Sequence, residues 1–150
     1  MTNILGDFPD VYNNEYTYSN GNISLIKTYR MVDGNLQLDS TEQYVYQSGN
    51  VIERTRTSTI ISPGTVYYTY DNLKNPFSGM NKYLQQILET ENITGLNANN
   101  AITRSHYSSG NPDLITQTYT IEYNQNGYPT NIKKFSDTNT LMCDTTIEYR

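Results

Sequence analysis

The chain has 150 residues, a formal net charge of −5 and 15 tyrosines, with no tryptophan. This length suits one domain over residues 1–150 with its own core. The negative charge argues against nucleic acid and anionic membrane surfaces as partners, because both require a positively charged face. A single cysteine, Cys143, excludes an internal disulfide and a metal site built from several cysteines.

No stretch approaches the ~18 consecutive apolar residues that a membrane-spanning helix requires. The first ten residues, MTNILGDFPD, lack the basic region and the apolar run of a signal peptide. We therefore expect no transmembrane segment and no signal peptide in this chain. A lipid anchor outside it is left open.

The first half of the chain predicts a series of hairpins. Asn20-Gly21 and Asp33-Gly34 accept the positive φ angles that tight hairpin turns require. Ser48–Asn50 and Ser62–Gly64 mark two further breaks. The strands expected between these turns cover residues 16–18, 23–31, 36–46, 51–61 and 66–71.

The pattern changes after residue 75. Asn75-Pro76 can serve as the N-cap and first residue of a helix. An apolar stripe with helical spacing follows and predicts one α-helix over about 78–90, then a polar loop over 92–100. The stripe consists of Met80, Tyr83, Leu84, Ile87 and Leu88.

The second half returns to strands, expected at 102–107, 114–123, 128–135 and 140–149. The clearest unit is Thr118–Phe135, in which alternation places Ile121 and Tyr123 on one face. Asn126-Gly127 then turns the chain. Similar pairs of bulky residues, separated by one spacer, recur at roughly constant intervals. They are Tyr16/Tyr18, Tyr44/Tyr46, Tyr68/Tyr70, Ile121/Tyr123 and Ile147/Tyr149.

These patterns predict a mainly β fold. We expect a twisted or curved antiparallel sheet of eight or nine strands, built from repeated hairpins, with the helix at 78–90 packed on it. A true structural repeat and an ordinary meander of hairpins with similar lengths both give this sheet.

Two segments carry a family resemblance. Tyr68–Phe77, YTYDNLKNPF, and Glu122–Thr130, EYNQNGYPT, resemble the uncharacterised YD-repeat-like domains of Bacteroidetes lipoproteins. The resemblance runs from about Tyr16 to Tyr149. Gly-Asn or Gly-Tyr stands where full YD repeats have Gly-Arg, and no lipoprotein cysteine is near the start. The resemblance implies a cell-envelope location, in the periplasm or at the outer-membrane surface, and no established activity.

Few residues point to catalysis. His106 is the one histidine, and no Gly-x-Ser-x-Gly motif accompanies it, so a surface or edge histidine is expected. Glu122 and Glu148 occupy equivalent repeat positions and would form a carboxylate pair if their strands were neighbours; two solvated side chains are the favoured alternative. Cys143, beside Met142, is expected to be packed.

No metal site is expected, because no turn has the ligand spacing of an EF-hand loop. No cofactor is expected either, since the chain has no phosphate-binding loop and no dinucleotide-binding glycine motif.

The tyrosines form the most distinctive candidate site. If uncovered, their rings and hydroxyls would bind a surface ligand such as a glycan, a peptide or a lipid; if covered by the helix, they form the core. We expect a non-enzymatic envelope binding or scaffold module. The alternatives are a carrier of a small apolar ligand or glycan in a tyrosine-lined groove, and a carboxylate-dependent hydrolase. The candidate ligand-binding residues are Tyr18, Tyr46, Tyr70, Tyr123 and Tyr149.

Overall fold

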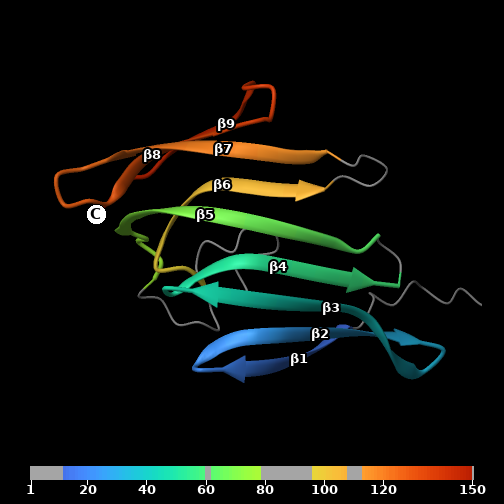
Figure 1. The fold of residues 1–150 in the computed structure, drawn as a ribbon. Coiled ribbons are helices and arrows are strands. Elements are labelled where there is room, and N and C mark those ends of the chain that lie inside the picture. The colour runs from blue at the N-terminus through green and yellow to red at the C-terminus, as the bar shows by residue number, and fades with distance from the viewer. Residues whose placement is uncertain (1–11, 60–61, 79–95, 108–112, 150) are drawn as a thin grey trace, which may run out of the picture. The chain divides into compact units, whose positions relative to one another are not determined.

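The computed structural model describes residues 12–59, 62–78, 96–107 and 113–149. Its strands form one antiparallel sheet of nine strands in sequence order (Figure 1). This confirms the predicted mainly β fold of eight or nine strands. The strands are β1 (Tyr12–Ser19), β2 (Asn22–Val32), β3 (Asn35–Gln47), β4 (Asn50–Ser58), β5 (Gly64–Lys74), β6 (Asn99–Tyr107), β7 (Leu114–Tyr123), β8 (Pro129–Phe135) and β9 (Leu141–Thr146).

The described residues contain no α-helix. The predicted helix over about 78–90, with its apolar stripe, falls outside them except at its first residue. Asn75 does begin a turn there, because its Oδ1 accepts the N–H of Phe77 at 2.9 Å and its carbonyl accepts the N–H of Ser78 at 3.1 Å. The packing of a helix on the sheet therefore stays a prediction.

Three connections are two-residue hairpin turns at predicted positions. The pairs Asn20-Gly21, Asp33-Gly34 and Ser48-Gly49 all have positive φ, between 48° and 79°. Two consecutive positive φ angles define the type I′ turn, whose twist matches that of the flanking strands. The local sequence thus sets these three turns.

The last two hairpins have longer loops. Asn124 donates its N–H to the carbonyl of Tyr128, and Ser136 donates to that of Thr140, each at 2.9 Å. In each loop the residue before the closing one has positive φ, Gly127 at 78° and Asn139 at 59°. The predicted Asn126-Gly127 turn is therefore confirmed in place, but Asn126 does not share the positive φ of a two-residue turn.

The chain divides into two compact units. Unit 1 comprises residues 1–44 and 55–63, and unit 2 comprises residues 45–54 and 64–150. The prediction of a single domain over 1–150 stays a prediction.

Unit 1 buries few side chains. Ile23 is 1% exposed, and Tyr44 and Ser40 are also buried. All eight residues of β1 are exposed, because among the strands that the structure describes it is at the edge of the sheet and pairs only with β2. The buried side chains in the described part of unit 1 therefore lie on β2 and β3.

Unit 2 has a larger core of mixed chemistry. Val51, Val66 and Tyr68 are its buried hydrophobic side chains. Buried asparagines accompany them. These are Asn50, Asn75, Asn97 and Asn100.

Candidate functional site

An asparagine cluster ties the β3–β4 hairpin to the start of β6 within unit 2. Asn50 and Asn99 bond each other twice, since Asn50 Nδ2 donates to Asn99 Oδ1 and Asn50 Oδ1 accepts the backbone N–H of Asn99, both at 2.9 Å. Asn97 Oδ1 accepts the backbone N–H of Val51 at 2.7 Å. Because both groups are buried, neither could turn to water instead.

The hairpin turn itself fits closely against this cluster. Gly49 accepts the N–H of Ala98 at 3.1 Å, and a Cβ added to Gly49 would lie 3.2 Å from the Cβ of Ala98. Gly49 also has a φ of 79°, which other residues rarely adopt. Both the backbone conformation and the limited space therefore favour glycine here.

A second part of the cluster surrounds the carboxylate of Asp71. Its Oδ1 accepts the N–H groups of Leu73 at 3.1 Å and Asn100 at 3.0 Å. Its Oδ2 accepts bonds from the Asn100 amide and the Tyr123 hydroxyl. Burial and the bond to Asp71 raise the pKa of Tyr123 above its usual value, so the hydroxyl stays protonated and donates.

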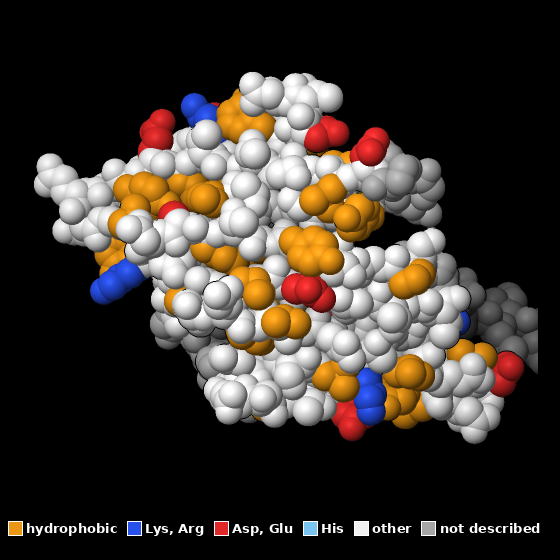
Figure 2. Space-filling view, in the orientation of Figure 1, with side chains coloured by type: hydrophobic (Ala, Val, Ile, Leu, Met, Phe, Trp, Pro, Cys, Tyr) orange, Lys and Arg blue, Asp and Glu red, His pale blue; other side chains and the backbone are white. Residues whose placement is uncertain are grey.

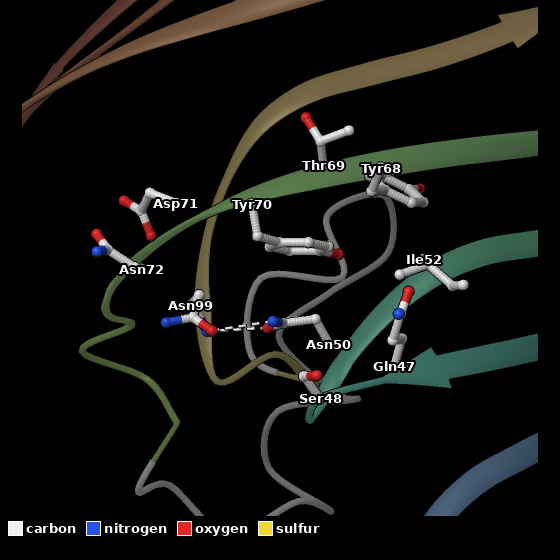
Figure 3. A pocket seen from close by; sticks show the side chains of 10 residues that line it. All are labelled: Gln47, Ser48, Asn50, Ile52, Tyr68, Thr69, Tyr70, Asp71, Asn72 and Asn99. Carbon is white, nitrogen blue, oxygen red and sulfur yellow. Dashed lines mark hydrogen bonds between the residues drawn. The ribbon is translucent and has the colours of Figure 1, made fainter.

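An open groove of about 530 Å³ lies over the asparagine cluster (Figure 3). On one side it is lined by the β3–β4 hairpin, from which Gln47, Ser48, Asn50 and Ile52 extend (Figure 3). On the other side it is lined by β5 and the start of β6. These contribute Tyr68, Thr69, Tyr70, Asp71, Asn72 and Asn99.

The polar side chains on the floor of the groove already make hydrogen bonds, whereas those on its rim can bond a ligand. The floor residues Asn50, Asn99 and Asp71 bond one another or the backbone, and the Tyr70 hydroxyl donates to the carbonyl of Val51 at 2.6 Å. The rim residues Gln47, Ser48 and Asn72 are exposed. Within the part of the chain that the structure describes, their side chains make no hydrogen bond. We name these three side chains the polar rim.

The structure places the five predicted tyrosines in different surroundings. Tyr18 lies on β1 of unit 1 and is 42% exposed. In unit 2, Tyr70 lines the groove, whereas Tyr123 bonds Asp71. Burial raises the pKa of Tyr46 to about 12. Tyr149 lies beyond the end of β9, donates to the carbonyl of Pro129 at 2.8 Å and contacts Tyr128.

The carboxylate pair loses its structural basis. Glu122 lies opposite Asn131 of β8, and Asn131 lies opposite Thr146 of β9, so β8 separates the two strands. Neighbouring strands are about 4.8 Å apart, so the backbones near Glu122 and Glu148 are on the order of 10 Å apart. Both side chains are exposed. A shared catalytic pair required that the strands near Glu122 and Glu148 be neighbours. They are not neighbours, so this requirement is not met.

His106 and Cys143 also differ from expectation. His106 lies on β6, an interior strand, and is half-buried rather than at an edge. Burial and the positive charges of Arg104 and Lys134 lower its pKa. Cys143 is exposed on β9, so its prediction as a packed residue is wrong. In the described part of the chain β9 is an edge strand, which pairs with β8 alone.

The sequence prediction missed the asparagine cluster. Residues 92–100 were expected to form a polar loop, but Asn99 and Asn100 begin β6, and Asn97 and Asn100 are buried. Asparagine favours turns in general, so its burial depends on partners far away in the sequence. The dense run Asn97-Ala98-Asn99-Asn100 was the one available sign.

Two further observations limit the chemistry of the described residues. Within them, no group of three or more His, Cys, Asp or Glu side chains is placed to hold a metal ion. Among the same residues, no helix has the length and apolar character to cross a membrane.

Comparisons with known proteins bear on the fold. No protein-family model and no curated protein matches this chain. A solved structure described as a porin-like protein from Bacteroides vulgatus matches with a TM-score of 0.60 and 14% identity, over 95% of this chain and 66% of that one. A protein of unknown function from Bacteroides fragilis matches with a TM-score of 0.43 and 14% identity, over 92% of this chain and 93% of that one. The chain thus spans about two thirds of the length of the porin-like protein, whose likeness shows a shared fold.

Proposed function

We propose that the protein is a non-enzymatic binding module of the bacterial cell envelope, and that its groove holds an uncharged glycan. The observation that carries the proposal is the polar rim, three available hydrogen-bonding side chains above a floor whose polar groups are already paired. A paired floor keeps its shape when a ligand arrives, so little ordering of the protein opposes binding.

The chemistry of the groove suits a sugar. The amides of Gln47 and Asn72 and the hydroxyl of Ser48 can each donate and accept, as sugar hydroxyls also do. The half-buried ring of Tyr70 extends along the same groove (Figure 3) and provides apolar surface for the C–H groups of a sugar. A small apolar ligand would leave the polar rim without partners, which makes it the weaker alternative.

The groove is also poorly suited to hydrolysis. Asp71 is the one carboxylate among its lining residues, and backbone N–H groups, Asn100 and Tyr123 already bond it. Acid–base cleavage of a glycosidic bond normally requires two carboxyl groups on either side of the bond. The lining residues therefore favour binding without turnover.

Two likenesses support an envelope location. The sequence resembles YD-repeat-like domains of Bacteroidetes lipoproteins through Tyr68–Phe77 and Glu122–Thr130. A chain described as porin-like shares the fold over 95% of this chain. Together they favour a location in the bacterial envelope for this protein.

Calorimetric titration with neutral oligosaccharides tests the proposal. Maltohexaose, cellohexaose and xylohexaose cover three backbone geometries, and we expect at least one to bind. Gln47→Ala and Asn72→Ala should each weaken binding about 5- to 15-fold, the equivalent of roughly 1–1.5 kcal/mol for one hydrogen-bonding side chain. The matched controls Gln43→Ala and Asn14→Ala change exposed side chains of the same types on β3 and β1, so affinity should stay unchanged.

Two results would contradict the proposal. Equal affinities for the rim variants and the wild type would remove the groove as the site. Shortened oligosaccharides, detected by mass spectrometry after incubation with the protein, would instead favour the hydrolase alternative.

A further inference from the structure

Unit 2 carries another surface on the opposite side of β5 from Tyr68. Strand side chains alternate, so Tyr67 and Thr69 point away from Tyr68. Tyr67 lies opposite Ser105 and Thr69 opposite Thr103 on β6. The same rows continue onto β7, and side chains directly opposite each other in a sheet lie on the same face. The β7 members are Thr116 opposite Ser105, Thr118 opposite Thr103 and Leu114 opposite Tyr107.

Hydroxyl pairs run across this surface. The Oγ1 atoms of Thr69 and Thr103 are 2.6 Å apart, and Ser105 Oγ lies 2.8 Å from Thr116 Oγ1. Each pair uses one of its two hydroxyl protons for its own bond. One proton and several lone pairs per pair therefore remain for a ligand.

Aromatic and aliphatic side chains lie beside the hydroxyl pairs. Tyr67 is 41% exposed, Tyr107 is 54% exposed and Leu114 is 45% exposed. Figure 2 shows hydrophobic side chains over β5 and beside the adjoining ends of β6 and β7, within a surface of mostly uncharged polar groups, with one acidic side chain beside the hydrophobic group over β5. We name the eight residues of these rows the hydroxyl face. They are Tyr67, Thr69, Thr103, Ser105, Tyr107, Leu114, Thr116 and Thr118.

The hydroxyl face carries no charged side chain, although the chain has 10 basic and 15 acidic residues. On the side of β8, the nearest charged pair in register is Lys133 with Asp144, in the row of Thr120. These two side chains lie 4.0 Å apart and so partly neutralise each other. A partner that matches this surface is therefore neutral, and it presents both hydroxyls and apolar C–H groups.

We propose that the hydroxyl face binds the flat surface of a neutral polysaccharide. Sugar rings stack their C–H faces on Tyr67 and Tyr107, while the paired hydroxyls of β5, β6 and β7 bond the sugar hydroxyls. The proposal shares its ligand class with the proposed function of the groove, and Thr69 belongs to both surfaces, but its tyrosines Tyr67 and Tyr107 do not line the groove. A face of this kind suits an ordered, many-chain surface, whereas the groove holds a single chain.

Sedimentation with insoluble particles tests this proposal. Microcrystalline cellulose, chitin and starch granules each present neutral chains in ordered arrays, and the intact protein should bind at least one of them. The Tyr67→Ala/Tyr107→Ala variant should reduce the partition constant about 10-fold or more, since aromatic side chains dominate contacts of this type. Tyr16→Ala, which changes a tyrosine 38% exposed on β1, should leave particle binding unchanged.

The groove variant Asn72→Ala separates the two proposals. It should retain particle binding while it loses affinity for soluble oligosaccharides. If Asn72→Ala lost particle binding and Tyr67→Ala/Tyr107→Ala retained it, the hydroxyl face would be overturned and the groove would remain the proposed binding site. Circular dichroism of each variant verifies that the sheet is intact. A second variant of the hydroxyl face, Thr69→Val/Thr103→Val, keeps the side-chain shapes but removes both hydroxyls, so it should also weaken particle binding.

Three outcomes would overturn the hydroxyl face as a polysaccharide site. One is the absence of binding to all three particles. Another is unchanged binding by the tyrosine double variant. The third is a wild-type dimer in analytical ultracentrifugation that the same variant dissociates, because the occupant of the face would then be a second copy of the chain.

Discussion

Units 1 and 2 of the sheet connect their strands with different side-chain chemistry. In unit 1 the cross-strand contacts join charged groups near the surface, with Lys27 Nζ 3.7 Å from Glu15 Oε2 and Arg56 Nε 3.6 Å from Glu42 Oε1. Unit 2 has such a pair too, between Lys133 and Asp144, but it also joins the β3–β4 hairpin to the segment before β6 through buried amides, as in the bond from Val51 to Asn97. Exposed ion pairs contribute little, whereas a buried polar group without a partner is costly. We therefore expect the buried amides to contribute more than the ion pairs to the free energy of unfolding.

The largest effect is expected from Asn97→Ala. Asn97 is 2% exposed, and its loss leaves the N–H of buried Val51 without its acceptor. We expect a decrease of about 2–3 kcal/mol in the free energy of unfolding. Urea unfolding followed by tyrosine fluorescence measures it. Asn14→Ala on exposed β1 is the control and should change stability by less than about 0.5 kcal/mol; equal effects of the two variants would erase the contrast between the units.

A smaller effect is expected from Tyr123→Phe. The variant removes one donor to the Asp71 carboxylate but keeps the ring. Hydrogen bonds to charged groups contribute about 1.5–3 kcal/mol, and the remaining donors from Leu73 and Asn100 place the loss near the lower end. Thermal unfolding measures the change. Tyr16→Phe on β1 is the matched control, and a Tyr123→Phe protein as stable as this control would contradict the role assigned to the bond.

Alkaline titration sharpens the comparison further. Burial raises the pKa of Tyr46 to about 12 in unit 2, above the usual value of about 10. The unfolded chain therefore loses this proton first, so the associated stability is complete below pH ~10 and is lost as the pH rises through about 12. Tyr46→Phe should remove this part of the pH dependence. Unfolding midpoints measured between pH 9 and 12 test it, and parallel curves for the two proteins would contradict it.

Tyr29 of unit 1 has a raised pKa for a different reason. Its hydroxyl donates to Glu15 at 2.9 Å, and this bond is the main cause of the shift, ahead of burial. A tyrosine pKa is thus raised in both units, by a surface carboxylate in unit 1 and by burial in unit 2.

The smallest effect is expected from Lys27→Gln in unit 1. Its partner Glu15 is 58% exposed at the side chain, so solvent screens the pair. The free energy of unfolding should decrease by less than about 0.5 kcal/mol, and the difference should vanish in 1 M NaCl. A loss comparable to that of Asn97→Ala would show that ion pairs matter as much as buried amides.

Much of the fold was predictable because its determinants are local. Asn20-Gly21 and Asp33-Gly34 gave the correct turn positions, since a two-residue hairpin accepts few other residues at positive φ. The alternation of Ile121 and Tyr123 likewise gave the right strand, now β7. The closing strand was overextended, however, because β9 ends at Thr146 while the tyrosine pattern continues to Tyr149.

The candidate site was predictable only in part. Tyr70 was expected and does line the groove, yet its hydroxyl is engaged with Val51. The polar rim of Gln47, Ser48 and Asn72 was not predicted. These residues are ordinary turn and strand-end types, and nothing in their immediate sequence indicates that the β3–β4 hairpin and β5 place them around one groove.

The sequence by itself determined most strand positions and the hairpin turns between them, because side-chain alternation and turn chemistry act over a few residues. Only the tertiary structure decided which polar residues are buried and which are available. Asn50 and Asn99 are 49 positions apart and satisfy each other, while exposed Asn72 stays available at the rim of the groove. The physical reason is that an amide is stable in the core only when partners from distant strands complete its hydrogen bonds.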